Sequence, residues 1–519
     1  MRTKLLGYPV AKRNLETHSL FAHRYLNGEA PGWVYYILQL STIVPVLKGD
    51  TPAKGIRPIS VFSTLAKAWK AEYARDLRGP ISDSAVLMPT QLGVGAPNGG
   101  GTIALATDIF METLGAQNGQ AVIACDIKNA FSETKRKAII EALLECPIKE
   151  VQKIVNCVHK SLSISSKATN FDVMIEEGGP QGCPWMPHLF ALVYQKVLLQ
   201  AQRDVGLRAS VMAYLDDTTF MGDLKASLEA MRKLAINAKD TIDLQFNPSK
   251  TLVMARNCDD ARATINEMAA QDPWFRDVKI GCIPGADPAT IQWGQGVGVM
   301  INGSPRGDIV YKHYHLDRIE ATAGATAERT VDLIGASNPQ GAYGLLRYSA
   351  QTLLNHIAQA NHPSLTKPYL KRYQKRVDSL LTRFTGLDFC RLRTEGDNMQ
   401  TLTGLRIGLK TSQGGLGFRS LSSSAEAAYL GGFIMAAPRM SRRKATVDMD
   451  RSSFWNFPHL PPNSTAIPGC CEILHPYLNP NPDLDLFYVS TTGRVRRERF
   501  KRLFSTNNLQ RSATIAAVY

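Results

Sequence analysis

The sequence predicts an α+β fold in which helices accompany an antiparallel sheet. Short runs of apolar and β-branched residues at 121–125 and on both sides of residues 216–217 predict strands, and the second pair predicts a hairpin. Apolar residues recur at three- and four-residue spacing within 134–143, 187–202 and 345–357, which predicts helices there. With 519 residues, 44% of them hydrophobic and 20% charged, the chain is long enough for several globular subdomains.

Two adjacent acids, Asp216 and Asp217, lie at the tip of the predicted hairpin. Apolar residues lead into this pair over 211–215, and Thr-Thr-Phe follows it at 218–220. Adjacent carboxylates at a buried turn repel each other unless a cation neutralises them. Mg²⁺ is the usual cation, because it prefers oxygen ligands and leaves room for substrate phosphates. A solvated Asp-Asp turn is the ordinary alternative, but the apolar flanks disfavour it.

A third acid, Asp126, ends the predicted strand at 121–125. Ser132 is a candidate N-cap for a helix over 133–144, so Asp126 lies between a strand end and a helix. Carboxylates from two strands can hold two metal ions about 3.5–4 Å apart, an arrangement that suits in-line phosphoryl transfer. Asp126 and Asp216 could supply such a pair, whereas either acid alone would be interpreted as structural.

The order of six motifs resembles that of reverse transcriptases, and more narrowly those of eukaryotic non-LTR retrotransposons. The motifs are 54–59 (Lys-Gly-Ile-Arg-Pro-Ile), 91–95 (Gln-Leu-Gly-Val-Gly), 126–131 (Asp-Ile-Lys-Asn-Ala-Phe), 179–184 (Gly-Pro-Gln-Gly-Cys-Pro), 214–217 (Tyr-Leu-Asp-Asp) and 246–251 (Phe-Asn-Pro-Ser-Lys-Thr). Residues 344–347 and 414–418 resemble connector elements of the same proteins. The resemblance covers roughly residues 33–435. It implies a right-hand polymerase with fingers, palm and a mostly helical thumb and connector.

The resemblance also implies roles for the acids and for one aromatic residue. Asp126, Asp216 and Asp217 are the expected catalytic residues and metal ligands, holding two Mg²⁺ ions for which Mn²⁺ could substitute. Phe131 follows Asp126 by five residues and would exclude the 2′-hydroxyl of a ribonucleotide. The alternative for Phe131 is a place in the core, which is where most Phe side chains lie.

Five further residues are expected to bind substrate. Gly182 would let the backbone approach a ligand closely, and Gln181 would hydrogen-bond the incoming nucleotide or the template. Lys48 and Arg57 would face the triphosphate, although a solvated side chain is an equal alternative for Lys48. Lys250 would either give a proton to pyrophosphate or contact a phosphate.

The charge balance indicates a polyanionic partner. The net charge is +15 and the isoelectric point about 9.3, and basic residues cluster at 367–383, 439–444 and 494–502. The expected partners are an RNA template, a DNA primer or target, and dNTPs. We expect the cluster at 367–383 to be a helix that follows a nucleic-acid backbone, with a solvated helix face as the alternative.

Five regions are predicted: a lead-in with one helix at 1–47, fingers and palm at 48–256, a primer-grip-like region at 257–310, thumb and connector at 311–438, and a basic tail containing Pro and Ser at 439–519. No membrane span or secretory leader is predicted, and nine scattered cysteines without a CxxC pair suit a reducing nuclear or cytoplasmic compartment. The endonuclease usual in non-LTR elements is not visible, so we expect a piece of a longer polyprotein, a truncated copy or a domesticated remnant.

Two other functions remain open at this stage. An RNA-dependent RNA polymerase shares the palm, but Phe131 and the Leu215 within the acidic tetrad fit a reverse transcriptase better. A non-catalytic RNA-binding scaffold on the same fold is disfavoured by the three intact acids.

Overall fold

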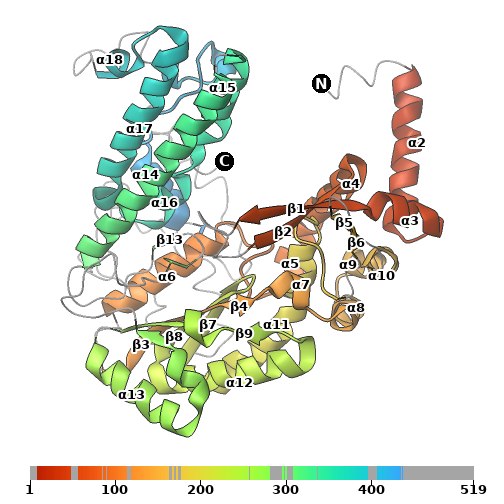
Figure 1. The fold of residues 1–519 in the computed structure, drawn as a ribbon, viewed down its shortest axis with the longest axis vertical. Helices are drawn as coiled ribbons and strands as arrows, with labels where there is room; N and C mark the ends of the chain where they lie inside the picture. Colours follow the sequence, from red (N-terminus) through yellow and green to blue (C-terminus); the bar gives the residue numbers. More distant parts are fainter. Residues whose placement is uncertain are drawn as a thin grey trace, which may run out of the picture. The chain divides into compact units, whose positions relative to one another are not determined.

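The chain is a helix-rich α+β protein, as predicted (Figure 1). The computed structural model describes residues 9–436 apart from internal gaps, of which the longest are 48–55, 281–294, 301–307 and 395–405. These residues divide into two compact units, each described by itself. The sheet unit comprises residues 1–99, 123–251 and 266–279, and the helical unit comprises 100–122, 252–265 and 280–519.

A five-stranded sheet has the order β11-β10-β3-β8-β7. Its strands are β3 (Gln120–Cys125), β7 (Ala209–Tyr214), β8 (Asp217–Asp223), β10 (Leu252–Ala255) and β11 (Lys279–Ile280). β7 and β8 form the predicted antiparallel hairpin, in which Tyr214 is opposite Asp217. Almost every residue of β7, β8 and β10 is buried, so both faces of these strands are covered; β7 and β10 are mostly apolar, and β8 also buries Thr218 and Thr219.

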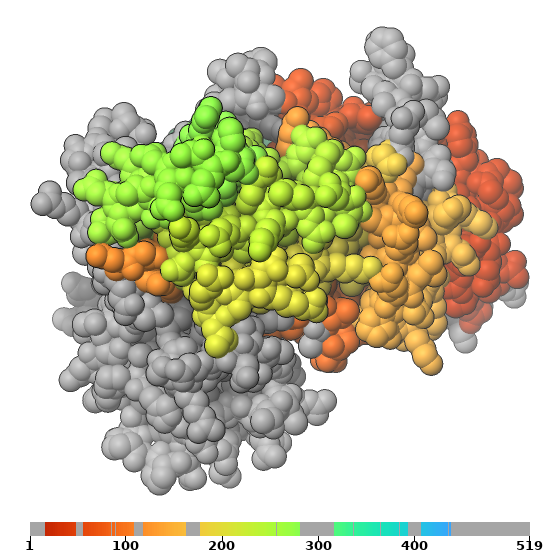
Figure 2. Space-filling view, turned by 90° about the horizontal axis from the view of Figure 1, so that it is seen from below, coloured from red at the N-terminus to blue at the C-terminus, as the bar shows by residue number. Residues whose placement is uncertain are grey.

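Two long helices cover this hairpin. α11 (Met186–Val205) and α12 (Leu224–Ile242) contact each other and β7 or β8, and in Figure 2 these yellow and yellow-green segments lie side by side on one face. α12 begins where the Asp223 carboxylate accepts a 2.7 Å hydrogen bond from the Ala226 backbone N–H. The hairpin therefore passes directly into a capped helix at the end of β8 that lies away from its turn.

A second sheet, whose strands all belong to the sheet unit, has the order β2-β1-β5-β6. β1 (Ser41–Leu47) pairs antiparallel with β2 (Ile56–Phe62) and parallel with β5 (Ser166–Ala168), so this sheet is mixed. β6 (Phe171–Val173) completes it, and the short strands β4 (Ile127–Lys128) and β9 (Gln245–Phe246) form a separate antiparallel pair.

Two local predictions were wrong. The lead-in contains two helices, α2 (Pro9–Leu26) and α3 (Gly32–Gln39), because Gly28 takes a positive φ of 80° between them and Pro31 precedes the second. The helix expected over 133–144 is split into α7 (Ala130–Glu133) and α8 (Arg136–Glu145). Ser132 is inside α7 rather than at its N-cap, and the Lys135 N–H donates to the Ile242 carbonyl instead of continuing the helix.

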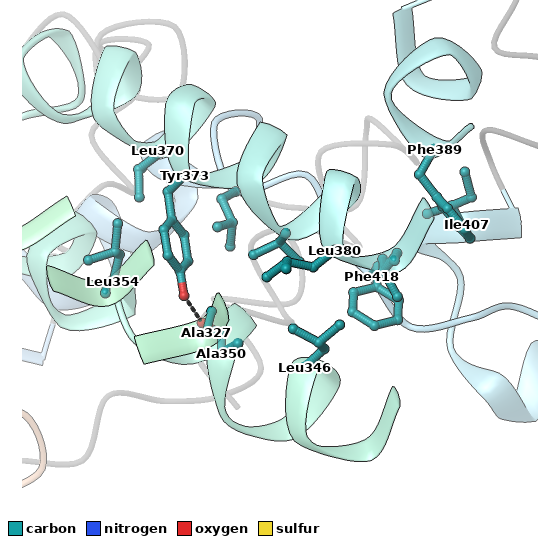
Figure 3. Close-up of a cluster of buried hydrophobic side chains, with 14 of the residues drawn as sticks. Ala327, Leu346, Ala350, Leu354, Leu370, Tyr373, Leu380, Phe389, Ile407 and Phe418 are labelled. Carbon is teal, nitrogen blue, oxygen red and sulfur yellow. Dashed lines mark hydrogen bonds between the residues drawn. The ribbon is translucent and has the colours of Figure 1, made fainter. Parts of the chain in front are cut away.

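The helical unit contains the predicted helices of residues 311–438. α14 (Asp308–Ile334) lies beside α17 (Pro363–Thr385), and α15 (Pro339–Tyr348), α16 (Asn355–Ala360) and α18 (Phe389–Thr394) pack around them. Figure 3 shows their shared core, in which the Tyr373 hydroxyl donates a 2.7 Å hydrogen bond to the Ala350 carbonyl. A two-stranded pair, β12 (Gln295–Gly296) and β13 (Val299–Met300), belongs to the same unit.

The remaining elements are short or connect the larger ones. They are α4 (Thr64–Asp76), α5 (Arg78–Ser84), α6 (Gly99–Thr113), α9 (Lys149–Lys153), α10 (Val155–Leu162), α13 (Cys258–Gln271) and the 3-10 helices η2 (Pro248–Lys250), η3 (Pro273–Asp277), η4 (Ala350–Thr352) and η5 (Thr411–Gln413). None of the helices in the described part of the chain combines the length and the apolar character needed to cross a membrane.

The two connector motifs come together inside the helical unit. The Tyr343 hydroxyl donates a 2.5 Å hydrogen bond to the Leu416 carbonyl, and the Tyr343 ring meets the buried Phe418 ring edge-on with centroids 5.5 Å apart. Leu346 is fully buried in the same core. Residues 343–347 and 414–418 are therefore packing partners, which the sequence did not predict.

Four of the six basic side chains in the cluster at 367–383 form ion pairs within the protein: Lys367, Arg372, Arg376 and Arg383. On α17, Arg372 pairs with Asp317, and Arg383 pairs with Asp332 at 2.6 Å, both acids belonging to α14. Arg376 lies 2.9 Å from the buried Glu320, at an angle that falls short of a hydrogen bond. A nucleic-acid track requires free charges, and these three arginines already have carboxylate partners.

Candidate active site

The turn between β7 and β8 consists of Leu215 and Asp216, and Asp217 begins the second strand. Leu215 has a φ of +57°, a left-handed conformation that non-glycine residues rarely adopt. Such a residue costs on the order of 1 kcal/mol and persists only where its surroundings hold it. The conformation places the two adjacent acids at the end of a rigid, buried hairpin.

Gln91 holds this turn in place. Its buried side-chain amide accepts a 2.8 Å hydrogen bond from the Leu215 N–H and donates a 3.0 Å bond to the Leu215 carbonyl. The same oxygen accepts the Gly93 N–H at 2.9 Å, and a Cβ at Gly93 would lie 2.6 Å from the Leu215 nitrogen. The motif at 91–95 was recognised from the sequence without a role for Gln91, although a polar residue two positions before a glycine was the available signal.

Asp126 lies at the end of β3, as predicted, and is connected to the lysine motif. The pairing of β4 with β9 brings the Asn247 N–H to the Asp126 carbonyl at 2.9 Å. The Lys250 ammonium lies 3.1 Å from the Asp126 carboxylate. The structure thus places Lys250 at the candidate site, with its charge directed at an acid.

The three acids repel one another. Desolvation and the charges of Asp216 and Asp126 raise the pKa of Asp217 to about 6, although part of the Asp217 side chain reaches solvent. Burial raises the pKa of Asp216, the charge of Asp126 adds to this shift, and the guanidinium of Arg57 opposes it. Arg57 therefore acts on the acids from β2, where it is exposed.

The chemistry of the donor set fits a divalent cation. Asp126, Asp216 and Asp217 offer carboxylate oxygens, and a bound cation would offset the burial and the repulsion that raise the pKa values of Asp216 and Asp217. As the side chains stand, no three acid, His or Cys groups among the described residues lie close enough to enclose an ion. The Lys250 ammonium instead neutralises one of the acids.

A glycine-rich loop joins the Asp126 segment to the strand of Arg57. On one side, the Gly179 N–H donates to the Phe131 carbonyl at 2.8 Å. On the other side, the Ser60 N–H donates to the Gln181 carbonyl at 2.7 Å. Gly182 has a φ of +114°, and a Cβ there would lie 2.4 Å from the Ser60 carbonyl oxygen. Gly182 is thus required for contact between backbones, whereas the sequence suggested an approach to a ligand.

The Phe131 side chain is half-buried and packs against another aromatic ring. Its ring meets the Phe190 ring of α11 edge-on, with centroids 5.3 Å apart. Phe190 stacks on Tyr194, whose hydroxyl forms a 2.8 Å hydrogen bond with that of Thr218, next to Asp217. A continuous aromatic row therefore runs from Phe131 to the acidic hairpin, which is compatible both with packing and with a role at the substrate.

Lys48 lies outside the described residues, so its expected role stays a prediction. Trp185, which follows the glycine-rich loop, is 1% exposed and points into the core. The buried Lys70 ammonium lies 5.1 Å from the Trp185 ring and 2.8 Å from the Gln39 side-chain oxygen. Trp185 therefore anchors the start of α11, a role that sequence reasoning did not assign.

Comparisons with known proteins place a family model on this part of the chain. Residues 46–274 match the model described as reverse transcriptase (RNA-dependent DNA polymerase). A search of curated proteins finds no match.

Solved structures similar to this chain include telomerases from two Candida species. Telomerase from Candida albicans, solved with a fragment of telomeric RNA, is 10% identical to this chain, with a TM-score of 0.36. The match covers 69% of this chain and 62% of the telomerase chain. Telomerase from Candida tropicalis with the same kind of RNA fragment is 11% identical, with a TM-score of 0.34 over 79% of this chain and 64% of its own.

An apo Candida tropicalis telomerase truncated from its C-terminal domain is 13% identical, with a TM-score of 0.32 over 42% of this chain and 50% of its own. This chain spans less than two thirds of each of these three proteins. The family match covers the predicted palm motifs, both acidic segments and the lysine motif. At residues 46–274 this chain therefore carries a reverse transcriptase domain, the type of domain that has RNA-directed DNA polymerase activity.

Proposed function

We propose that this protein copies RNA into complementary DNA by two-metal-ion nucleotidyl transfer, and that it does so in the retrotransposition of a non-LTR element. The observation that supports this most strongly is the convergence, within the sheet unit, of Asp126, Asp216 and Asp217 with Lys250 and Arg57. Three repelling acids flanked by two cations form a charge arrangement suited to Mg²⁺ and a nucleoside triphosphate.

The acids would hold the metal ions, with Asp126 and Asp216 as the principal ligands. Bound Mg²⁺ would lower the pKa of the primer 3′-hydroxyl and neutralise charge on the triphosphate. Occupation of the site would release Lys250 from Asp126, and the freed ammonium could then contact phosphate or protonate pyrophosphate. Arg57 offers a planar fork of N–H donors to the triphosphate from β2.

The glycine-rich loop would form the substrate-facing wall. Gln181 is half-buried, and its backbone carbonyl is already bonded to Ser60, which leaves its side-chain amide for a nucleotide or the template. Phe131 is attached to this loop through its carbonyl. In this position its ring would restrict the space at the 2′-carbon of the incoming sugar and favour dNTPs.

The test is primer extension on an annealed RNA template with Mg²⁺, supplied with dNTPs or rNTPs separately. DNA product that disappears in the Asp216→Asn/Asp217→Asn double variant supports reverse transcription. Asp240→Asn is the matched control, since it removes an exposed carboxylate of α12 in the same unit. Product from rNTPs alone would indicate an RNA polymerase.

No product from either pool, with RNA still bound, would indicate a non-catalytic scaffold.

The retrotransposition role needs a second substrate, a nicked DNA duplex whose 3′ end primes synthesis on an RNA template. Extension from that nick supports the role, whereas extension only from preannealed primers contradicts it.

A further inference from the structure

We propose that the helical unit carries a binding site for single-stranded nucleic acid on the surface formed by the end of α15 and the loop at 409–417. We call this surface the α15 patch. It consists of an exposed aromatic ring, two basic side chains and three exposed leucines: Leu345, Arg347, Tyr348, Leu409, Lys410 and Leu416. The proposal concerns a unit other than the one that holds the candidate acids, and it does not depend on catalysis.

The patch is built around one arginine. The Arg347 guanidinium carbon lies 4.7 Å from the centre of the Tyr348 ring, and its Nη2 donates a 3.3 Å hydrogen bond to the Thr411 hydroxyl. Gly417, with a φ of +77°, makes room for this guanidinium, because a Cβ there would lie 2.5 Å from the Arg347 Nε. The loop and the helix therefore together hold an arginine and a tyrosine in a fixed stack.

Tyr348 is unusual for so large a ring, because 70% of its surface is exposed. Leu345, Leu409 and Leu416 are each at least 36% exposed and lie on the same helix end and loop. Beneath them, Leu346, Ile407 and Phe418 are almost fully buried in the core of Figure 3, so the surface is anchored. Exposed apolar area on a rigid base marks an interaction surface better than scattered exposed residues do.

The charge of the patch differs from that of α17 nearby in sequence. Residues 333–377 and 398–425, which include the whole patch, contain no Asp or Glu. Arg347 bonds a neutral hydroxyl, and Lys410 lies beside it at an exposed turn. On α17, by contrast, Arg372, Arg376 and Arg383 face carboxylates of α14. The patch thus keeps its positive charge available for a ligand, whereas these three arginines of α17 are paired with acids.

These features fit a single strand. A base can stack on the open face of Tyr348 or against the leucines, which tolerates any sequence, while Arg347 and Lys410 contact the phosphates. In a duplex the faces of the bases are stacked on one another, so a duplex could contact only Arg347 and Lys410 through its phosphates. An acidic peptide would use the charges but would leave the exposed ring without a stacking partner.

The experiment is fluorescence anisotropy of the full chain with labelled 12-nucleotide single-stranded RNA, single-stranded DNA and a blunt duplex, without Mg²⁺ or nucleotides. We expect Tyr348→Ala to weaken single-strand binding at least about fivefold, and Tyr348→Phe to retain it, because the ring carries the stacking. Lys410→Gln should reduce the steepness of log affinity against log salt by about 0.7, the value for one phosphate contact to a single strand. Comparison of the RNA and DNA arms shows which strand is preferred.

Arg383→Gln is the matched control, since it removes one positive charge from the paired face of the same unit. Crosslinking of 4-thiouridine RNA should label a peptide that contains Tyr348. Unchanged affinity in Tyr348→Ala, an equal loss in Arg383→Gln, or weakening confined to the duplex would each overturn the proposal. Asp216→Asn should retain this binding, so failure here is distinguishable from failure of the proposed polymerase function.

Discussion

The two units arrange charge in opposite ways. In the sheet unit, Asp126, Asp216 and Asp217 gather like charges, and burial and mutual repulsion raise the pKa of two of them. In the helical unit, acids of α14 alternate with arginines of α17 along a ladder of ion pairs. The first arrangement costs folding energy that a bound cation can offset, whereas the second is satisfied by the protein itself.

This difference separates charges that stabilise from charges that await a ligand. Counting basic or acidic residues along a segment does not distinguish them, because the partner comes from a distant helix. If the comparison is right, substitutions in the acid cluster will reduce activity and leave stability unchanged. Substitutions in the ladder of ion pairs will reduce stability and leave the activity per folded molecule unchanged.

The largest effect is expected for Asp216→Asn. Removal of a principal metal ligand should reduce DNA synthesis on the order of 10³-fold, while RNA binding persists. The melting temperature without Mg²⁺ should not fall, because the change relieves repulsion. Single-turnover primer extension and thermal melting measure the two quantities, and retained synthesis would remove Asp216 from the site.

Arg376→Met tests the other side of the comparison. It leaves the buried Glu320 with Arg372 at 3.8 Å as its remaining basic partner. We expect the free energy of unfolding to fall by roughly 2–3 kcal/mol, at or just below the low end of the cost of breaking a buried ion pair, because Arg376 is partly exposed. Urea denaturation gives this value. Reduced synthesis per folded molecule, with unchanged stability, would contradict the structural role of the ladder.

Gln91→Ala should loosen the left-handed turn at Leu215. Loss of its hydrogen bonds should slow synthesis about tenfold and cost on the order of 1 kcal/mol of stability. Gln202→Ala is the matched control, because Gln202 also bridges the backbone of β7, donating to Ala209 and accepting from Val211. Equal slowing in both variants would show that Gln91 only supports the fold.

Phe131→Ala should admit ribonucleotides, because it opens the space that the ring occupies beside the glycine-rich loop. We expect the preference for dNTPs over rNTPs to fall about tenfold, which corresponds to roughly 1.4 kcal/mol of discrimination. Phe190→Leu shortens the ring that Phe131 packs against and serves as the packing control. An unchanged preference in Phe131→Ala would make Phe131 a packing residue.

The smallest effect concerns pH. Because the pKa of Asp217 is raised from 3.8 to about 6, the folded state takes up a proton in this window and the free energy of unfolding falls as pH rises through it. Asp217→Asn should remove that dependence and raise the melting temperature slightly at pH 7.5 without Mg²⁺. Mg²⁺ affinity of the unchanged protein should weaken below pH 6, where protons compete. If the melting temperature depends on pH in the same way in both proteins, the raised pKa of Asp217 is contradicted.

The sequence by itself determined the α+β class, the acidic hairpin and the place of Asp126 at a strand end. These follow from local patterns: apolar runs predict strands, and acids at their ends are visible as departures from the pattern. The family match over residues 46–274 agrees with the motif order from which the polymerase interpretation was made. The roles of Arg57, Phe131, Gln181, Gly182, Lys48 and Lys250 remain proposals.

Only the tertiary structure decided which partners these residues have. No local pattern could show that Gln91 bonds both polar atoms of Leu215, that Gly182 contacts Ser60, or that the arginines of α17 meet acids of α14. Hydrogen bonds and ion pairs act over a few ångströms, and the residues that make these contacts are separated by about fifty to more than a hundred positions in the chain. Folding alone brings them within that range, so it decides which charges are neutralised and which remain for a ligand.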